Sequence, residues 1–195
     1  VEADHYLVWS DYMKGEIMQY YPWVSEQSIH VTGTPQFLPY FNPNNYMSRE
    51  AFAAAFALDA SATWICFSGD DELTSPHDPL YLRDLATAVQ SLNARGQNIQ
   101  IVFRPSPADI TIRYDAVLSD FASIIKKSKP QWEAPHGMNW GALIPMVKDY
   151  VFLCSIVYHC KAVFNVGSTM AIDFSISKVV VATSGNSADR TARIF

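Results

Sequence analysis

The sequence predicts an α/β protein whose core is a doubly wound, Rossmann-like parallel sheet. From residue 63 onwards, short and nearly continuous apolar runs alternate with amphipathic helical stretches, as expected for parallel strands covered on both faces. One of these runs, residues 162–166, stops at Gly167 and passes at once into a helical stretch that opens with Ser168 and Thr169. In doubly wound sheets, ligands bind beyond the carboxyl ends of the strands, so such turns indicate where a ligand site lies.

The first thirty residues predict a strand, a helix and a second strand. The apolar run 6–9 is followed by Ser10, a favourable N-cap residue, and then by Met13 and Ile17 at helical spacing. Pro22 ends this helix, and residues 28–31 form the second strand.

The next stretch, residues 36–46, contains prolines, asparagines and aromatic side chains without periodicity, and the turn around Gly33 and Pro35 precedes it. This composition predicts a linker with no helix or strand of its own. We therefore expect residues 1–46 to be the end of one domain with its linker. Residues 47–195 then form the Rossmann-like domain, which we expect to be truncated.

Several strands and helices are predicted in this second domain. Ser48 caps a helix that ends near Leu58. Ser75 to Asp78 resemble a capping box with Pro76 at the first helical position, which predicts a helix up to Gly96. The apolar positions between Val117 and Ile125 predict one helix closed by Pro130, and Asp149 starts another. The predicted strands are residues 64–67, 99–103, 179–182 and, more weakly, 131–134.

The turn after residue 166 is the main candidate site. Gly167 permits a strained turn, and Ser168 or Thr169 can cap the helix so that its first N–H groups form a cradle for an anion such as phosphate. Asp173, four residues beyond Thr169, lies on the same helical face, where it can accept hydrogen bonds from a hydroxyl-rich ligand, while Ile172 and Ile176 face the sheet. The alternative is that the two hydroxyls only cap a packing helix.

Other loops are expected at the same edge of the sheet. They cover residues 68–75, 104–109 and 135–139. Arg104 has two interpretations: it neutralises phosphate, or it pairs with Asp109 on the surface. His136 could border a nucleobase with Trp132 or Trp140 as a stacking face, or belong to a loop with packed tryptophans. Asp70, Asp71 and Glu72 could hold Mg²⁺, or simply precede a helix.

Composition narrows the class of protein. A net charge of -5 provides no basic surface for nucleic acid, which argues against that partner. The three cysteines lack metal-ligand spacing and fit buried thiols in a reducing compartment. No run approaches the roughly 20 apolar residues of a membrane span, and the first residues lack the plan of a signal peptide. These features predict a cytoplasmic protein without a transmembrane segment.

Three stretches together resemble the donor-binding half of GT-B glycosyltransferases, and are most similar to bacterial enzymes of the CDP-glycerol glycerophosphotransferase and surface-polysaccharide type. They are residues 32–35 after a strand, residues 103–107 at a strand end, and residues 166–173. The resemblance implies the C-terminal half of a GT-B fold, with residues 6–31 ending an acceptor domain and a hinge after Gly33. It also implies a role in the biosynthesis of cell-envelope polysaccharide and allows a peripheral position at the inner face of the membrane.

The same resemblance implies the roles of individual residues. Gly167, Ser168 and Thr169 would contact the diphosphate, Asp173 a ribose or donor hydroxyl, and Arg104 would add positive charge. Ser68, Gly69, Ser106 and His136 complete the expected substrate-binding set. Ser106 departs from the family pattern, in which a histidine usually stands at this place. A serine can donate a hydrogen bond but carries no charge near neutral pH.

The resulting hypothesis is the donor-binding part of a transferase that moves a glycosyl or alditol-phosphate group from a nucleotide diphosphate to a polysaccharide or lipid-linked acceptor. Catalysis would be electrostatic, through helix-end amides and Arg104, with no metal or separate cofactor required. The catalytic residues are not identified by the sequence, because the resemblance implies that the base lies in the acceptor domain. Two alternatives are a sugar-nucleotide 2-epimerase and a non-catalytic module that binds a nucleotide or a protein partner.

Overall fold

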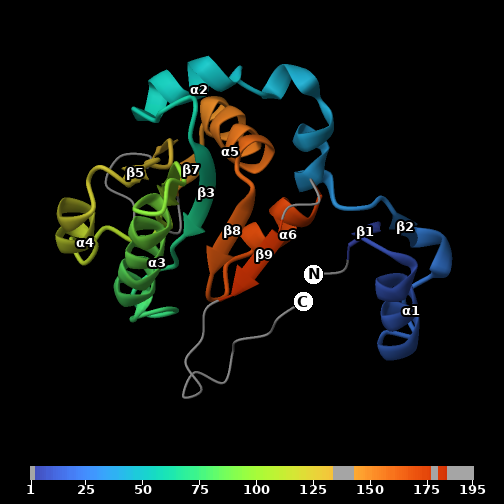
Figure 1. Cartoon of the computed structure of the whole chain (residues 1–195). Helices are drawn as coiled ribbons and strands as arrows, with labels where there is room; N and C mark the ends of the chain where they lie inside the picture. Colours follow the sequence, from blue (N-terminus) through green and yellow to red (C-terminus); the bar gives the residue numbers. More distant parts are fainter. Residues whose placement is uncertain (1–2, 134–142, 177–179, 184–195) are drawn as a thin grey trace. The chain divides into compact units, whose positions relative to one another are not determined.

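A computed structural model describes residues 3–133, 143–176 and 180–183 of the chain, and it divides into two compact units, Val1–Asn42 and Pro43–Phe195. The larger unit contains a five-stranded sheet in the order β5-β4-β3-β8-β9, in which every neighbouring pair is parallel. This is the doubly wound arrangement that the sequence predicts, and Figure 1 shows β3, β8 and β9 side by side.

The smaller unit is a strand, a helix and a strand, as predicted. β1 (Tyr6–Val8) pairs in parallel with β2 (Ile29–Val31), and α1 (Asp11–Tyr20) connects them through the short 3-10 helix η1 (Glu26–Ser28). The hydroxyl of Ser10 accepts the Met13 N–H at 3.3 Å, which confirms the predicted N-cap. The unit ends in η2 (Pro35–Phe41), so the stretch predicted as a structureless linker contains helical turns.

The elements of the larger unit alternate along the chain. Its helices and strands are η3 (Pro43–Asn45), α2 (Arg49–Phe56), β3 (Thr63–Ser68), α3 (Asp78–Asn93), β4 (Ile99–Arg104), α4 (Asp115–Asp120), β5 (Ile125–Lys127), β6 (Trp132–Glu133), β7 (Ile144–Pro145), α5 (Val147–His159), β8 (Ala162–Asn165), α6 (Met170–Ser175) and β9 (Val180–Thr183). β6 and β7 form a separate antiparallel pair beside the main sheet.

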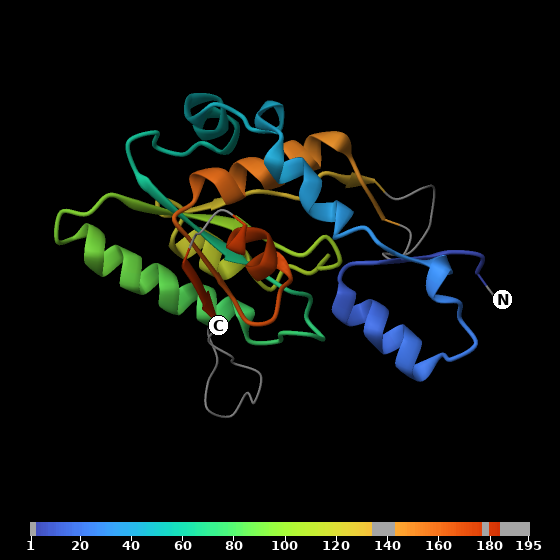
Figure 2. The ribbon, with the colours of Figure 1, turned by 90° about the vertical axis from the view of Figure 1, so that its right-hand side faces the viewer.

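Helices cover both faces of the sheet, with α3 on one side and α5 on the other (Figure 2). On the α3 side, Phe67 and Phe103 pack against Leu82 and Val117 in one buried cluster. On the other side, the fully buried Trp64 contacts Phe52 of α2 and His159 of α5, at ring-centroid distances of 5.5 and 5.9 Å. Alternate strand residues therefore supply two apolar layers, which accounts for the nearly continuous apolar runs in the sequence.

Two predicted helix boundaries are wrong. α3 begins at Asp78, so Pro79 and not Pro76 lies in its first turn, and the Ser75 hydroxyl bonds to the Asp78 carboxylate at 2.6 Å instead of capping the helix. α5 begins two residues before Asp149.

The predicted helix from Val117 to Ile125 is also wrong, because α4 ends at Asp120 and Ile125 opens the edge strand β5. Ile125 pairs with Ile101 of β4, and both are buried in the cluster below the sheet. The apolar spacing of these residues fits a helix. Pairing Ile125 with β4 buries the same side chains, so the chain forms a strand there instead.

Candidate functional site at the carboxyl edge of the sheet

The carboxyl ends of β3, β4 and β8 meet at one edge of the sheet, because the strands are parallel and Ser68 pairs with Arg104 across β3 and β4. We call the loops at this edge the rim. The turn of residues 167–169 follows β8, with Gly167 and Thr169 exposed and Ser168 half-buried. The Ser68 hydroxyl hydrogen-bonds to the Ser168 hydroxyl at 3.1 Å. The turn is therefore open to solvent and linked to the end of β3.

The local conformation of this turn differs from the prediction in three ways. Gly167 does not have a positive φ, and a Cβ placed on it would meet only Asp70 Oδ2 at 3.9 Å, so no strain requires glycine there. Thr169 occupies the N-cap position of α6 but its side chain makes no capping bond, while Ser168 Oγ accepts a long 3.4 Å bond from Met170. Ile172 is 52% exposed and does not face the sheet.

Asp173 lies near α5. It is half-buried, and its charge is one cause of the raised pKa of Cys154 on α5, which burial mainly raises to about 11. The prediction that Asp173 contacts a ligand hydroxyl remains a prediction.

Arg104 is buried in an ion pair. Its guanidinium contacts both carboxylate oxygens of Asp149 on α5, at 2.8 and 3.3 Å. The same carboxylate accepts the Gln131 N–H at 2.8 Å and the Trp132 indole N–H at 2.7 Å. The predicted surface pair with Asp109 is wrong, because Asp109 pairs with Arg113 at 2.6 Å. The charge of Arg104 is thus already compensated inside the protein.

A pocket of about 370 Å³ lies beside the loop that follows β4. Its walls include Ser106 and Thr111 from that loop, Lys127 and Lys129 at and after the end of β5, and Trp132 of β6. Both lysines are exposed, so their ammonium groups are available to an anionic ligand. The two lysines were not among the predicted site residues, because the apolar spacing before them indicates a helix closed by Pro130 and not a strand that ends at the rim.

A second pocket, of about 470 Å³, lies on the other side of the same loop. The loop after β3 contributes Asp71, Glu72 and Leu73, and the loop after β4 contributes Asp109 and Ile110. Asp71 and Glu72 give this pocket a negative character, whereas the first pocket carries two lysines; Asp109 lines both pockets and is paired with Arg113. A charged ligand would therefore be drawn to the first pocket by its anionic part.

The acidic cluster after β3 is held mainly by local hydrogen bonds. Asp71 accepts the N–H groups of Leu73 and Thr74, both at 3.0 Å, and the Thr74 hydroxyl at 2.8 Å. Within the described ranges, no group of three His, Cys, Asp or Glu residues is arranged to hold a metal ion. Asp71 therefore acts as a turn-forming residue that shapes the second pocket.

Gly69 is required by close packing. A Cβ on this residue would lie 2.5 Å from the Tyr114 hydroxyl and 3.1 Å from the Phe103 ring. Tyr114 itself is buried and bonds to Asp78 at 3.2 Å. The structure thus accounts for Gly69 by the approach of Tyr114, and its predicted contact with a substrate remains a prediction.

Asp70 is an unusual carboxyl at the rim. Its Oδ2 atom is buried and has no hydrogen-bond partner among the described residues. Burial, and next the charges of Asp78 and Asp71, raise the pKa of Asp70 from 3.8 to about 6, although Arg113 and the nearby backbone N–H of Gly167 act in the opposite direction. Asp70 is therefore partly protonated in mildly acidic solution.

This pKa predicts a pH-dependent stability that the Asp70→Asn variant removes. The folded state holds the proton more tightly than the unfolded chain, so the stabilisation is complete below pH 3.8 and is lost as the pH rises through about 6. At pH 8 we expect the variant to be about 1 kcal/mol more stable than the wild type, allowing for solvent screening of the half-exposed carboxyl, and near pH 4 we expect no difference.

Urea unfolding at both pH values measures this effect. Asp71→Asn is the matched control, because hydrogen bonds from Thr74 lower the pKa of Asp71 and the variant should be less stable than the wild type at pH 8. An equal effect of Asp70→Asn at both pH values would contradict the assignment.

His136, predicted to border a nucleobase, lies outside the described residues, as does Trp140. Trp132, the other predicted stacking residue, is described and lines the first pocket.

No protein-family model matches the sequence, and no curated protein is significantly similar to it. Solved structures do resemble the chain. The wall teichoic acid polymerase TagF, in a variant soaked with CDPG, aligns with a TM-score of 0.55 and 13% identity over 96% of this chain and 39% of its own. The UDP-GlcNAc 2-epimerase from Methanocaldococcus jannaschii aligns with a TM-score of 0.53 and 12% identity over 93% of this chain and 46% of its own.

The chain therefore spans less than half the length of the structures it matches. Among the described residues, no helix is both long enough and apolar enough to cross a membrane. At such low identity the likeness establishes the fold alone. The domain that carries the rim has the Rossmann-like α/β fold of one half of a GT-B protein, which confirms the fold class that the sequence predicts.

Proposed function

We propose that the larger unit binds a nucleotide diphosphate donor and is the donor-binding part of a transferase that moves a glycosyl or alditol-phosphate group to a polysaccharide or lipid-linked acceptor. The observation that carries this proposal is that the open turn 167–169 and the lysine-lined pocket belong to the same edge of one parallel sheet. The GT-B-like fold supports it, since neighbours of this fold include a wall teichoic acid polymerase and a sugar-nucleotide epimerase.

Each part of the rim has a chemical role in this proposal. The exposed ring of Trp132 offers a stacking face to the nucleobase, and Lys127 and Lys129 offer positive charge to the phosphates. The lysines take the role that the sequence had assigned to Arg104, because Arg104 is neutralised by Asp149. Positive charge at this place would stabilise the negative charge that develops on the leaving diphosphate.

The smaller unit is proposed to be part of an acceptor domain. This unit leaves large apolar side chains exposed on several of its elements, among them Leu7 of β1 at 70%, Tyr12 of α1 at 75% and Trp23 in the turn after α1 at 69%. Parallel sheets are normally covered on both faces, and neighbouring exposed apolar side chains are typical of contact surfaces, so this unit favours packing against further structure of the same domain. The acceptor and the catalytic base would then belong to that domain.

Titration with CDP, UDP and GDP tests the proposal. We expect one of them to bind the wild-type chain, and Lys127→Ala with Lys129→Ala to weaken binding at least 10-fold, because each lost charge-assisted hydrogen bond costs about 1.5–3 kcal/mol. Ser168→Ala with Asp173→Ala should also weaken binding. Isothermal titration calorimetry measures the dissociation constants.

Lys126→Ala is the matched control. Lys126 directly precedes Lys127, but its ammonium group donates to the Ala122 carbonyl at 2.8 Å and it does not line the pocket. The control should bind as the wild type does. Absence of binding to all three nucleotides, or affinities that the lysine and serine variants leave unchanged, would reject the proposal.

A sugar-nucleotide 2-epimerase is the second candidate, favoured by the likeness to the archaeal epimerase at a TM-score of 0.53. Detection by NMR of an epimerised UDP-sugar would favour the epimerase over the transferase. Nucleotide binding without turnover in a protein that includes the acceptor domain would instead favour a non-catalytic binding module.

A further inference from the structure

Two loops of the rim shape both pockets. We call residues 69–77, between β3 and α3, the first rim loop, and residues 105–114, between β4 and α4, the second rim loop. The second rim loop forms one wall of the lysine-lined pocket, and the acidic pocket lies between the two loops. The spacing of these loops therefore sets the shape of any ligand site at this edge of the sheet.

A carboxylate organises each loop: Asp78, the first residue of α3, for the first loop, and Asp109 for the second. In the first, Asp78 Oδ2 accepts the Asp70 N–H at 2.7 Å, and Asp78 Oδ1 accepts the Ser75 hydroxyl at 2.6 Å. In the second, Asp109 Oδ1 accepts the N–H and the hydroxyl of Thr111, at 3.0 and 2.7 Å. These bonds shape each loop but do not join one loop to the other.

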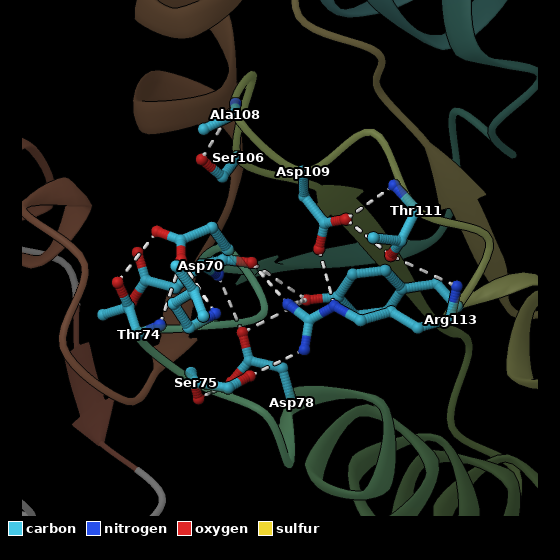
Figure 3. Close-up of polar contacts among 12 residues, drawn as sticks. Asp70, Thr74, Ser75, Asp78, Ser106, Ala108, Asp109, Thr111 and Arg113 are labelled. Carbon is cyan, nitrogen blue, oxygen red and sulfur yellow. Dashed lines mark hydrogen bonds and ion pairs between the residues drawn. The ribbon is translucent and has the colours of Figure 1, made fainter. Parts of the chain in front are cut away.

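Arg113 joins them. Its Nε donates to Asp109 Oδ2 at 2.6 Å within its own loop, while Nη1 donates to the Ser75 carbonyl at 2.7 Å and Nη2 to the Asp70 carbonyl at 2.6 Å (Figure 3). Nη2 also donates to the Tyr114 hydroxyl at 2.9 Å, and that hydroxyl bonds to Asp78 Oδ2 at 3.2 Å and to the Asp70 carbonyl at 3.4 Å, so Tyr114 adds longer contacts to the same link. One rigid, planar guanidinium thus holds two backbone carbonyls of the first loop and one carboxylate of the second.

The environment keeps this side chain charged and fixed. Only 11% of the Arg113 side chain and 1% of the Asp109 side chain are exposed. Burial lowers the pKa of Arg113, but the hydrogen bond and charge of Asp109 more than offset it, so the pKa is raised. A lysine could keep the ion pair with Asp109, but its single ammonium group lacks the fork that reaches both carbonyls.

We propose that Arg113 is a positioning residue for the ligand-binding rim: it lines neither pocket, yet it fixes the second rim loop against the first and so preforms both pockets. This inference rests on the proposed function for the identity of the ligand. The tie between the loops does not depend on the ligand.

The test compares Arg113→Gln and Arg113→Lys with the wild type at a temperature where all are folded. Hydrogen exchange of the free chain should become at least 10-fold faster in the two rim loops of both variants, with exchange in β3 and β4 unchanged. Nucleotide binding should weaken at least 10-fold in both. Arg113→Lys should recover thermal stability relative to Arg113→Gln but not affinity, whereas a purely stabilising role would restore both together.

Arg83→Gln is the matched control, since it removes an arginine from the exposed pair with Asp120 on α4 and should change neither readout. Unchanged exchange in the rim loops of Arg113→Gln would overturn the tie whether or not a nucleotide binds. Affinity that is unchanged in Arg113→Gln, or fully restored in Arg113→Lys, would overturn the positioning role. If the wild type binds no nucleotide but hydrogen exchange is faster in the variants, a nucleotide is rejected as the ligand, and the link that Arg113 makes between the two rim loops still holds.

Discussion

Asp149→Ala is expected to lower the free energy of unfolding by about 3–5 kcal/mol, the range measured when one partner of a buried ion pair is removed. The Arg104 side chain is 8% exposed and Asp149 is its partner, so the variant leaves a buried guanidinium without its counter-charge. The substitution also deprives the Gln131 N–H and the Trp132 indole N–H of their acceptor. An uncompensated buried charge outweighs the gain from removing the carboxylate itself.

Urea unfolding at pH 7 measures this loss, and Asp120→Ala provides the comparison. Asp120 pairs with Arg83 at 2.8 Å, but both side chains are roughly half-exposed, so its removal should cost less than about 1 kcal/mol. If Asp149→Ala and Asp120→Ala lower the free energy of unfolding by similar amounts, Arg104 must reach solvent or another partner. Arg104 would then be available to bind phosphate.

Gly69→Ala is expected to cost about 2–3 kcal/mol, because the added methyl group overpacks a rigid contact. Its Cβ would lie 2.5 Å from the Tyr114 hydroxyl, and Tyr114 cannot easily withdraw. Its ring packs on Phe103 with centroids 4.5 Å apart, and its hydroxyl bonds to Asp78 and Arg113. Thermal and urea unfolding of the variant measure the effect.

A double-mutant cycle with Tyr114→Phe isolates the cause. Removing the hydroxyl removes the shortest contact, so Gly69→Ala should cost less in the Tyr114→Phe background than in the wild type. Gly15→Ala is a suitable control, because a Cβ there meets nothing within 4 Å and alanine favours the helix that contains it. Additive effects of the two rim substitutions would contradict the proposed clash.

The order of strands and helices was predictable because the spacing of apolar residues, which distinguishes a strand from a helix, is a local property of the chain. Ser10 and Ser48 cap helices as predicted, with their hydroxyls accepting N–H groups three residues on. The helix predicted through Ile125 failed because local spacing cannot show that Ile125 pairs with Ile101 of β4. That error concealed Lys127 and Lys129, which lie at and just beyond the end of the missed strand.

The candidate site was predictable only in outline. The edge of the sheet follows from parallel strands, and the turn 167–169 is at that edge and open. The partner of Arg104 was not predictable, since Asp149 lies 45 residues away and is placed by the docking of α5. The role of Arg113 was missed for the same reason, because its two carbonyl acceptors come from a loop about 40 residues earlier.

By itself the sequence determined the fold class, most element positions and which loops lie at the carboxyl edge of the sheet, because the spacing of apolar residues and the choice of turn residues are local properties of the chain. The tertiary structure alone decided which charges remain available there. Arg104 is buried in an ion pair and Arg113 joins two loops, whereas Lys127 and Lys129 are exposed at a pocket. The physical reason is that a charged side chain is available to a ligand only if packing brings no counter-charge within hydrogen-bond distance of it. Segments distant in the sequence supply that counter-charge, so local patterns do not reveal it.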